Sequence, residues 1–170
     1  MKSINECLDQ ELRWVHPQLR RRAYELRAYD EVLARISYTG ALSSRVRAET
    51  AAGLWTFGRT GLRQAITIQE LDTDTEPATV KRGMNGQATL LFPDEREYRW
   101  QCSSFWQDAW TWLNDECTPL LYLKRGTYVH LEAAARDLTE LALLATLAWY
   151  LHRQQEEEAA SVAAIVPVIS

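Results

Sequence analysis

The side chains best suited to acid–base or metal chemistry are scattered and form no recognisable catalytic set. The histidines His16, His130 and His152 lie far apart, and none belongs to a motif of nucleophilic or metal-assisted catalysis. The run from Asp72 to Glu76 has carboxylates at alternate positions, as calcium loops do, but it lacks the glycine and the closing glutamate of an EF-hand loop. We interpret it as a solvated acidic turn, and we predict no catalytic residue, no metal site and no cofactor.

The three cysteines have no redox or metal-binding spacing. Cys7, Cys102 and Cys117 are odd in number and form no CxxC pair. Free thiols in a reducing compartment are the simplest interpretation. Since the N-terminal residues also lack the apolar core of a signal peptide, we expect a cytoplasmic protein.

Basic residues are the remaining side chains that could bind something. Arg45 and Arg47 alternate along a predicted strand, so their side chains should project from one face. Lys81 and Arg82 are neighbours in another predicted strand, and further clusters occur at 20–22 and 124–125. Taken alone, such residues are typical of the solvated surface of a folded domain.

The elements that must position these side chains include one unusual segment near the end of the chain. Residues 138–151 are apolar on every side of a helical wheel, apart from a slot at Thr139 and Thr146 whose hydroxyls can bond back to carbonyls one turn earlier. A helix without a polar face must be enclosed by protein or lipid. Because a bilayer needs about 20 apolar residues, we expect a core helix over about 137–158 and no transmembrane span.

Short segments of alternating apolar and polar residues, separated by turn signals, fill the rest of the chain. We expect about twelve strands, near 12–17, 21–29, 31–38, 44–50, 53–59, 63–70, 78–82, 87–92, 96–102, 106–113, 119–124 and 127–132. Closure would remove exposed strand edges, and a helix of about 10 Å diameter would fill the interior. The fold class is therefore mainly β: a closed antiparallel barrel around a central C-terminal helix, in one domain over 1–170, with flexible ends at 1–10 and 159–170.

The tryptophans fit this arrangement. Trp100, Trp106, Trp110 and Trp112 lie close together in the sequence. We expect their large rings to fill the space between the barrel wall and the helix. The overall charge also limits the function. A net charge of −4 and an isoelectric point near 5.4 argue against nucleic-acid binding.

Strands followed by one apolar C-terminal helix resemble the tubby C-terminal-like group, which includes the tubby domain, the LURP-one-related proteins of plants and the phospholipid scramblases. More narrowly, the chain resembles small bacterial proteins of that type. The segments that carry the likeness are aromatic-rich strand residues and the helix: 11–14, 24–27, 54–57, 98–100, 105–106, 112–113 and 144–150. The resemblance implies a twelve-stranded barrel threaded by the helix. Tubby domains bind phosphoinositide head groups through basic residues on the barrel wall, so it also implies an outer-wall anion site, for which Arg45, Arg47, Lys81 and Arg82 are the candidates.

Two classes of function follow. The first is a non-enzymatic binding or scaffold domain that recognises an anionic lipid head group or a small acidic ligand, or that binds a protein partner. The alternative is a small-molecule binder or an enzyme with a pocket at one end of the barrel. Titratable groups clustered at a barrel mouth would favour this alternative.

Overall fold

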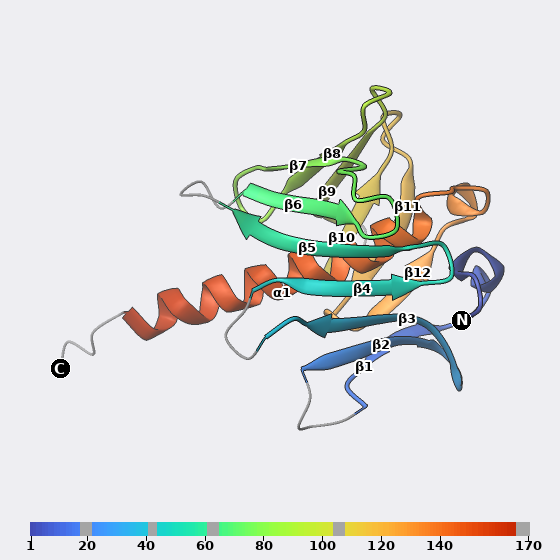
Figure 1. Cartoon of the computed structure of the whole chain (residues 1–170), viewed down its shortest axis with the longest axis horizontal. Coiled ribbons are helices and arrows are strands. Elements are labelled where there is room, and N and C mark those ends of the chain that lie inside the picture. The colour runs from blue at the N-terminus through green and yellow to red at the C-terminus, as the bar shows by residue number, and fades with distance from the viewer. Residues whose placement is uncertain (18–21, 41–43, 61–64, 104–107, 166–170) are drawn as a thin grey trace.

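The protein is a closed antiparallel barrel of twelve strands around one helix (Figure 1), in a computed structural model that describes residues 1–17, 22–40, 44–60, 65–103 and 108–165. The strands are β1 (Leu12–Val15), β2 (Ala23–Ala28), β3 (Glu31–Tyr38), β4 (Val46–Thr50), β5 (Leu54–Thr60), β6 (Ala65–Glu70), β7 (Thr79–Arg82), β8 (Ala88–Leu91), β9 (Glu97–Cys102), β10 (Ala109–Leu113), β11 (Pro119–Lys124) and β12 (Tyr128–Leu131). Each strand pairs with its neighbours in the sequence, and β1 pairs with β12 to close the ring.

The predicted fold class and strand pattern are confirmed. Observed strand ends differ from the expected ones by at most a few residues, and the expected strand residues at 21, 63–64 and 106–107 lie outside the described part of the chain. Alternation explains the agreement: in β4, Val46 and Ala48 are buried inside the barrel whereas Arg47 and Glu49 are exposed on its outer wall.

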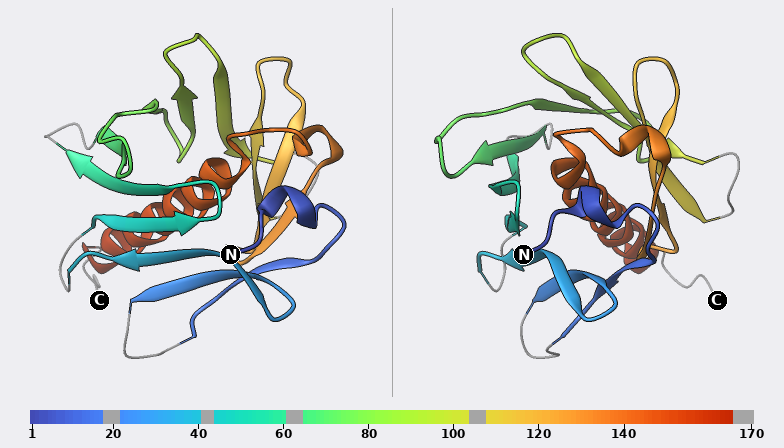
Figure 2. Two further views of the ribbon diagram at one scale, coloured as in Figure 1. Left: turned by 45° about the vertical axis from the view of Figure 1, so that its right-hand side comes forward. Right: turned by 90° about the vertical axis from the view of Figure 1, so that its right-hand side faces the viewer.

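The helix α1 (Leu141–Ile165) runs through the barrel, as the end-on view in Figure 2 shows. Every residue from Leu141 to Leu151 is buried, which confirms that this apolar segment is a core helix. The hydroxyl of Thr146 is fully buried and donates to the carbonyl oxygens of Ala142 and Leu143 over 2.9 and 3.0 Å. This is the predicted back-bonding that lets a polar residue stay in an apolar core.

The ends of the helix differ from the prediction. The helix begins at Leu141 rather than near 137, because the first helical hydrogen bond runs from the Leu144 N–H to the Glu140 carbonyl oxygen. It also continues beyond 158 to Ile165, so residues 159–165 of the expected tail belong to the helix. Alanine has the highest helix propensity, and four alanines in this segment favour helical continuation. The segment projects from the barrel as an arm (Figure 1).

The N-terminal residues are also more ordered than expected. A short 3-10 helix, η1 (Ile4–Cys7), lies at the barrel end near the start of α1 (Figure 2). Ile4, Cys7 and Leu8 are buried, and the Asn5 side-chain amide donates to the carbonyl oxygens of Arg136 and Leu138 over 2.9 and 3.0 Å. Three buried side chains at helical spacing thus hold this segment against the barrel end, where the sequence indicates a candidate for disorder.

Tryptophans fill the space between wall and helix, as predicted. Trp100 and Trp112 are 1% and 0% exposed, with ring centroids 5.3 Å apart. Trp110 is half-buried and stacks on Trp100 at 5.7 Å, and Trp106 lies outside the described residues.

Candidate functional site

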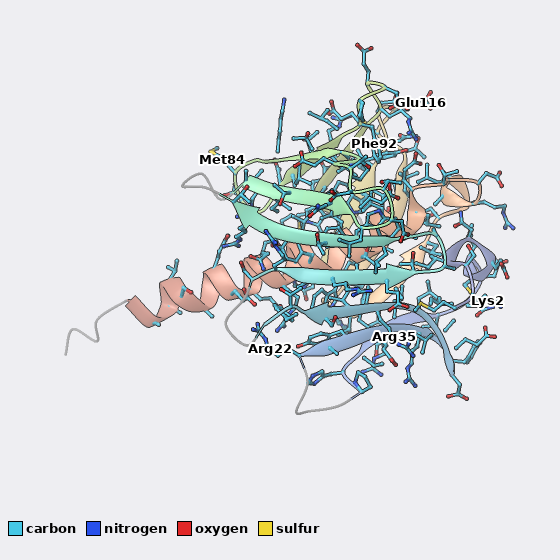
Figure 3. All side chains as sticks on the ribbon, viewed as in Figure 1. Lys2, Arg22, Arg35, Met84, Phe92 and Glu116 are labelled. Atoms are coloured by element: carbon cyan, nitrogen blue, oxygen red, sulfur yellow. The ribbon has the colours of Figure 1, made fainter. Side chains whose placement is uncertain are left out.

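Four consecutive strands each present one arginine on the outer wall of the barrel. Arg13 lies on β1, Arg27 on β2, Arg35 on β3 and Arg47 on β4, and their strand neighbours on either side point into the core. We call these four residues the arginine row. Figure 3 labels Arg35 on this side of the barrel. Arg13 and Arg27 are direct partners in the β1–β2 register, so two guanidinium groups extend from adjacent positions.

One carboxylate is inserted into the arginine row. Glu25 accepts hydrogen bonds from Arg27 at 2.6 and 2.9 Å and from Arg35 at 3.1 Å. Its partial burial raises the pKa of the carboxyl, but the bonds from both arginines outweigh burial and hold the pKa below its usual value. Glu25 therefore stays ionised and fixes Arg27 and Arg35.

The two ends of the arginine row are differently placed. The guanidinium of Arg13 lies over the ring of Tyr128, 5.1 Å from its centroid. Within the described part of the chain, no carboxylate lies within 4 Å of the Arg13 or Arg47 guanidinium. The guanidinium groups of Arg13 and Arg47 can therefore bind an external anion.

Two hollows open beside the arginine row, and each is lined by two of its members. A shallow hollow of about 690 Å³ lies beside Arg13 and Arg27, and Glu11 and Tyr29 also line it. A smaller one of about 120 Å³ lies beside Arg35 and Arg47; its walls include Glu25, Ser37 and Glu49. Each hollow thus offers two guanidinium groups next to at least one carboxylate.

The four residues predicted as a ligand site do not form one cluster. Arg47 belongs to the arginine row, and Arg45 precedes β4 and lies against Gly58. Lys81 is exposed on β7, three strand spacings or about 14 Å from β4. Arg82 points the other way, toward the helix, where it binds a carboxylate. The adjacent positions of Lys81 and Arg82 explain this divergence, because neighbouring strand residues face opposite sides.

Where α1 leaves the barrel, three arginines of the barrel contact its glutamates. We call Arg22, Arg59, Arg82, Glu157 and Glu158 the exit collar. Arg82 donates to both oxygens of Glu158 at 2.7 and 3.0 Å, and Arg59 donates to Oε1 at 2.6 Å. Arg22 lies 3.9 Å from Glu157, at the same end of the barrel (Figure 3).

Contacts at the exit collar shift the pKa values of Glu158 and of the neighbouring Tyr150. Bonds from Arg82 hold the pKa of Glu158 below its usual value, against a smaller opposing effect of burial. Burial raises the pKa of the neighbouring Tyr150 to about 12. Glu158 is therefore ionised, and Tyr150 neutral, at neutral pH.

A third hollow, of about 320 Å³, opens beside the helix at the same barrel mouth. It is lined by Asp108, Trp110, Arg125, His152 and Glu156. The Nδ1 atom of His152 is buried and has no hydrogen-bond partner among the described residues. Burial lowers the pKa of His152, so the imidazole is neutral and could accept or donate one hydrogen bond to a ligand.

Sequence reasoning missed most of these residues. Arg13, Arg27 and Arg35 each occupy an outward position in a strand, but only the β1–β2 and β2–β3 registers bring them side by side. Arg59 was missed because it occupies an inward position near the end of β5. A charged residue is usual at such a position only where a group of opposite charge lies close to it. Alternation within β5, with Trp55 and Phe57 inward, was the available signal.

Across the described ranges, no three histidines, cysteines or carboxylates are grouped as metal ligands would be. Among the helices described, none combines the length and the apolarity that crossing a membrane requires. His16 stacks on Tyr24 at 4.8 Å and His130 lies 3.4 Å from Glu132, both at the surface.

The chain matches no family model, and no curated protein or solved structure is similar enough to it to count as a match. The kinship with the tubby C-terminal-like group therefore stays a prediction. The function has to be argued from the side chains described above.

Proposed function

We propose that this protein is a non-enzymatic binding domain whose arginine row recognises a small anion. The anion would be a phosphate or carboxylate group, carried by a lipid head group or by a soluble acidic ligand. The observation that carries the proposal is the direct pairing of Arg13 with Arg27 across β1 and β2. Like charges at directly opposed positions of a sheet are destabilising, and a bound anion between them would relieve that cost.

The size of the anion follows from the carboxylates nearby. Glu11 lines the larger hollow, and Glu25 and Glu49 line the smaller one. They leave too little net positive charge for an extended polyanion, in agreement with the net charge of −4. A single phosphate or carboxylate group, bound by Arg13 next to the Arg27 that Glu25 holds in place, fits this distribution better.

The test measures binding of both forms of the anion. Liposome flotation at low salt would compare phosphatidylcholine vesicles with and without phosphatidic acid, and a thermal-shift titration would use glycerol phosphate as the soluble form. We expect the protein to respond to at least one of them. The variant Arg13→Gln should weaken that response, and Arg13→Gln with Arg47→Gln should abolish it.

The matched control is Lys81→Gln, which removes one exposed positive charge from the outer wall on β7. It should bind as the wild type does if the arginine row is the site. Equal losses for Arg13→Gln and Lys81→Gln would indicate general charge attraction, and no response to either probe would remove the proposal.

A second candidate is a small-molecule site in the hollow at the barrel mouth. Titratable groups cluster there, and the buried Nδ1 of His152 lacks a described partner. Trp110 offers a ring face, and Asp108, Glu156 and Arg125 offer both signs of charge, which suits a zwitterionic ligand such as an amino acid. Titration of amino acids against Trp fluorescence, with His152→Leu as the binding-deficient variant, would test it.

A further inference from the structure

We propose that Arg59 and Arg82 form a second oxoanion site, which Glu158 fills as a tethered internal occupant. The ligand would be a dianionic oxoanion such as phosphate. Its binding would displace the Glu158 carboxylate and loosen the projecting arm of α1. This inference does not depend on the arginine row, which lies on the outer wall, whereas these two arginines face the interior of the barrel mouth.

The geometry is that of an anion site. Arg59 comes from β5 and Arg82 from β7, and the two guanidinium groups meet on one carboxylate with three bonds of 2.6 to 3.0 Å. Their side chains are only 19% and 21% exposed, whereas Glu158 is 40% exposed. The cations therefore belong to the barrel wall, and the carboxylate is the more accessible partner.

The charges favour a dianion. Two guanidinium groups, from Arg59 and Arg82, bond the one singly charged carboxylate of Glu158. A phosphate dianion brings twice the charge and one more acceptor oxygen than the carboxylate, and guanidinium forks bind phosphate in the same bidentate way.

A second and independent observation lies one turn earlier on the same face of α1. Gln154 precedes Glu158 by four residues, is 1% exposed, and has neither its amide nitrogen nor its amide oxygen bonded to a described residue. Buried amides without partners are rare and call for an explanation. A ligand seated below the position of Glu158 would supply the acceptor that the Gln154 amide lacks.

Tethering makes Glu158 a strong competitor. Because it lies on the helix that runs through the barrel, its effective concentration at the two arginines is on the order of millimolar or higher. The wild-type protein should therefore bind free phosphate weakly, and removal of the carboxylate should reveal the site. The same competition links the site to the arm, since Glu158 is bonded to the barrel wall directly before the exposed residues Ala159 to Ala164.

The experiment titrates inorganic phosphate by isothermal calorimetry into the wild type and Glu158→Gln. We expect phosphate to bind Glu158→Gln at least about tenfold more tightly than the wild type. The control is Glu116→Gln, which removes one exposed negative charge in the connection between β10 and β11, outside the exit collar, and should behave as the wild type. Adding Arg82→Gln to Glu158→Gln should return the affinity to the wild-type level or below.

The variant Gln154→Met separates an effect on phosphate binding from a loss of folding. It replaces the buried amide by an apolar group of similar size, so the folded state should be at least as stable, while phosphate binding to the Glu158→Gln background should weaken. A stable Gln154→Met variant with undiminished phosphate affinity would count against the role of Gln154. Equal phosphate affinities of the wild type, Glu116→Gln and Glu158→Gln would overturn the site itself.

Two further measurements identify the source of the anion and test the link between the site and the projecting arm of α1. Vesicles with phosphatidic acid, compared with inorganic phosphate on Glu158→Gln, separate a lipid head group from a free oxoanion. In the wild type, saturating phosphate should accelerate amide hydrogen exchange at 159–165 and leave exchange at 141–151 unchanged. Unchanged exchange in the arm would overturn the displacement of Glu158. Binding to the arginine row is scored separately with Arg13→Gln and Arg47→Gln, so the two proposals fail independently.

Discussion

The indole N–H of Trp112 donates to the main-chain carbonyl oxygen of Leu144 over 3.0 Å, and both residues are fully buried. Trp112 belongs to β10 and Leu144 to α1, so this bond ties the barrel wall directly to the helix inside it. Most contacts between wall and helix are apolar and carry no direction. Because a hydrogen bond is directional, this bond restricts the rotation of the helix inside the barrel.

Trp112→Phe should therefore destabilise the protein by about 2 kcal/mol, through the lost bond and the volume left empty. Urea unfolding followed by far-UV circular dichroism measures this. Trp110→Phe is the control, since the half-buried Trp110 stacks on Trp100 and makes no such bond to the helix; its effect should be smaller. Equal losses for the two variants would mean that ring volume alone matters.

Leu144→Asp should prevent folding. The substitution would place a carboxylate where a fully buried side chain now packs, and no described cation lies on that part of the helix to pair with it. We expect a loss of about 4 kcal/mol or more, and an insoluble or molten product. Val162→Asp makes the same chemical change in the projecting arm, where Val162 is 65% exposed, and should leave the near-UV circular dichroism intact. A soluble, natively folded Leu144→Asp variant would contradict the central position of the helix.

The fold could be predicted from the sequence because its two signals reinforce each other. Period-two alternation in the strands and an all-apolar helix have one compact solution, a barrel that encloses the helix. The helix ends could not be predicted equally well. Glu140 pairs with Arg96 of a distant turn rather than capping a helix from 137, and the exposed alanines after Glu158 extend the helix beyond the barrel.

The candidate sites were less predictable, because they depend on register and on the face to which each arginine turns. Arg47 was identified from alternation alone. Arg82 was identified as basic but assigned to the wrong environment, since its partner Glu158 is distant in the sequence. Arg13 and Arg27 become a pair only through the β1–β2 register, and the sequence alone does not reveal that register.

Gly126→Ala should destabilise the protein by about 2 kcal/mol. Gly126 has φ +69°, a left-handed conformation that costs an alanine roughly 1–2 kcal/mol, and an added Cβ would lie 2.6 Å from Nε2 of His152. Gly83→Ala is the control, because its Cβ would meet only ordinary contacts of 3.4 Å or more. Adding His152→Ala should restore the part of the loss that comes from crowding, as measured by urea unfolding. No restoration would mean that the backbone conformation accounts for the whole loss.

Stability should also fall as the pH drops from about 7 to about 5, through His152. Burial lowers the pKa of its imidazole below the ordinary 6.5, while Glu156 partly opposes this. The other charged groups around the hollow are Asp108, Arg125 and, on the helix, Arg153. Below pH 6.5 the unfolded chain binds a proton that the folded chain does not, so each step down in pH favours unfolding.

Urea unfolding at several pH values isolates this contribution. His152→Gln should show a smaller loss of stability between pH 7 and pH 5 than the wild type, whereas His130→Gln, at an exposed position, should follow the wild type. The carboxylates held by arginines, Glu25 and Glu158, have lowered pKa values and stabilise the fold above the ordinary carboxyl pKa of 4.5. Their contribution is lost only at lower pH, as they become protonated, so the two effects occupy separate ranges. Parallel pH profiles for His152→Gln and the wild type would show that the buried imidazole is not the group responsible.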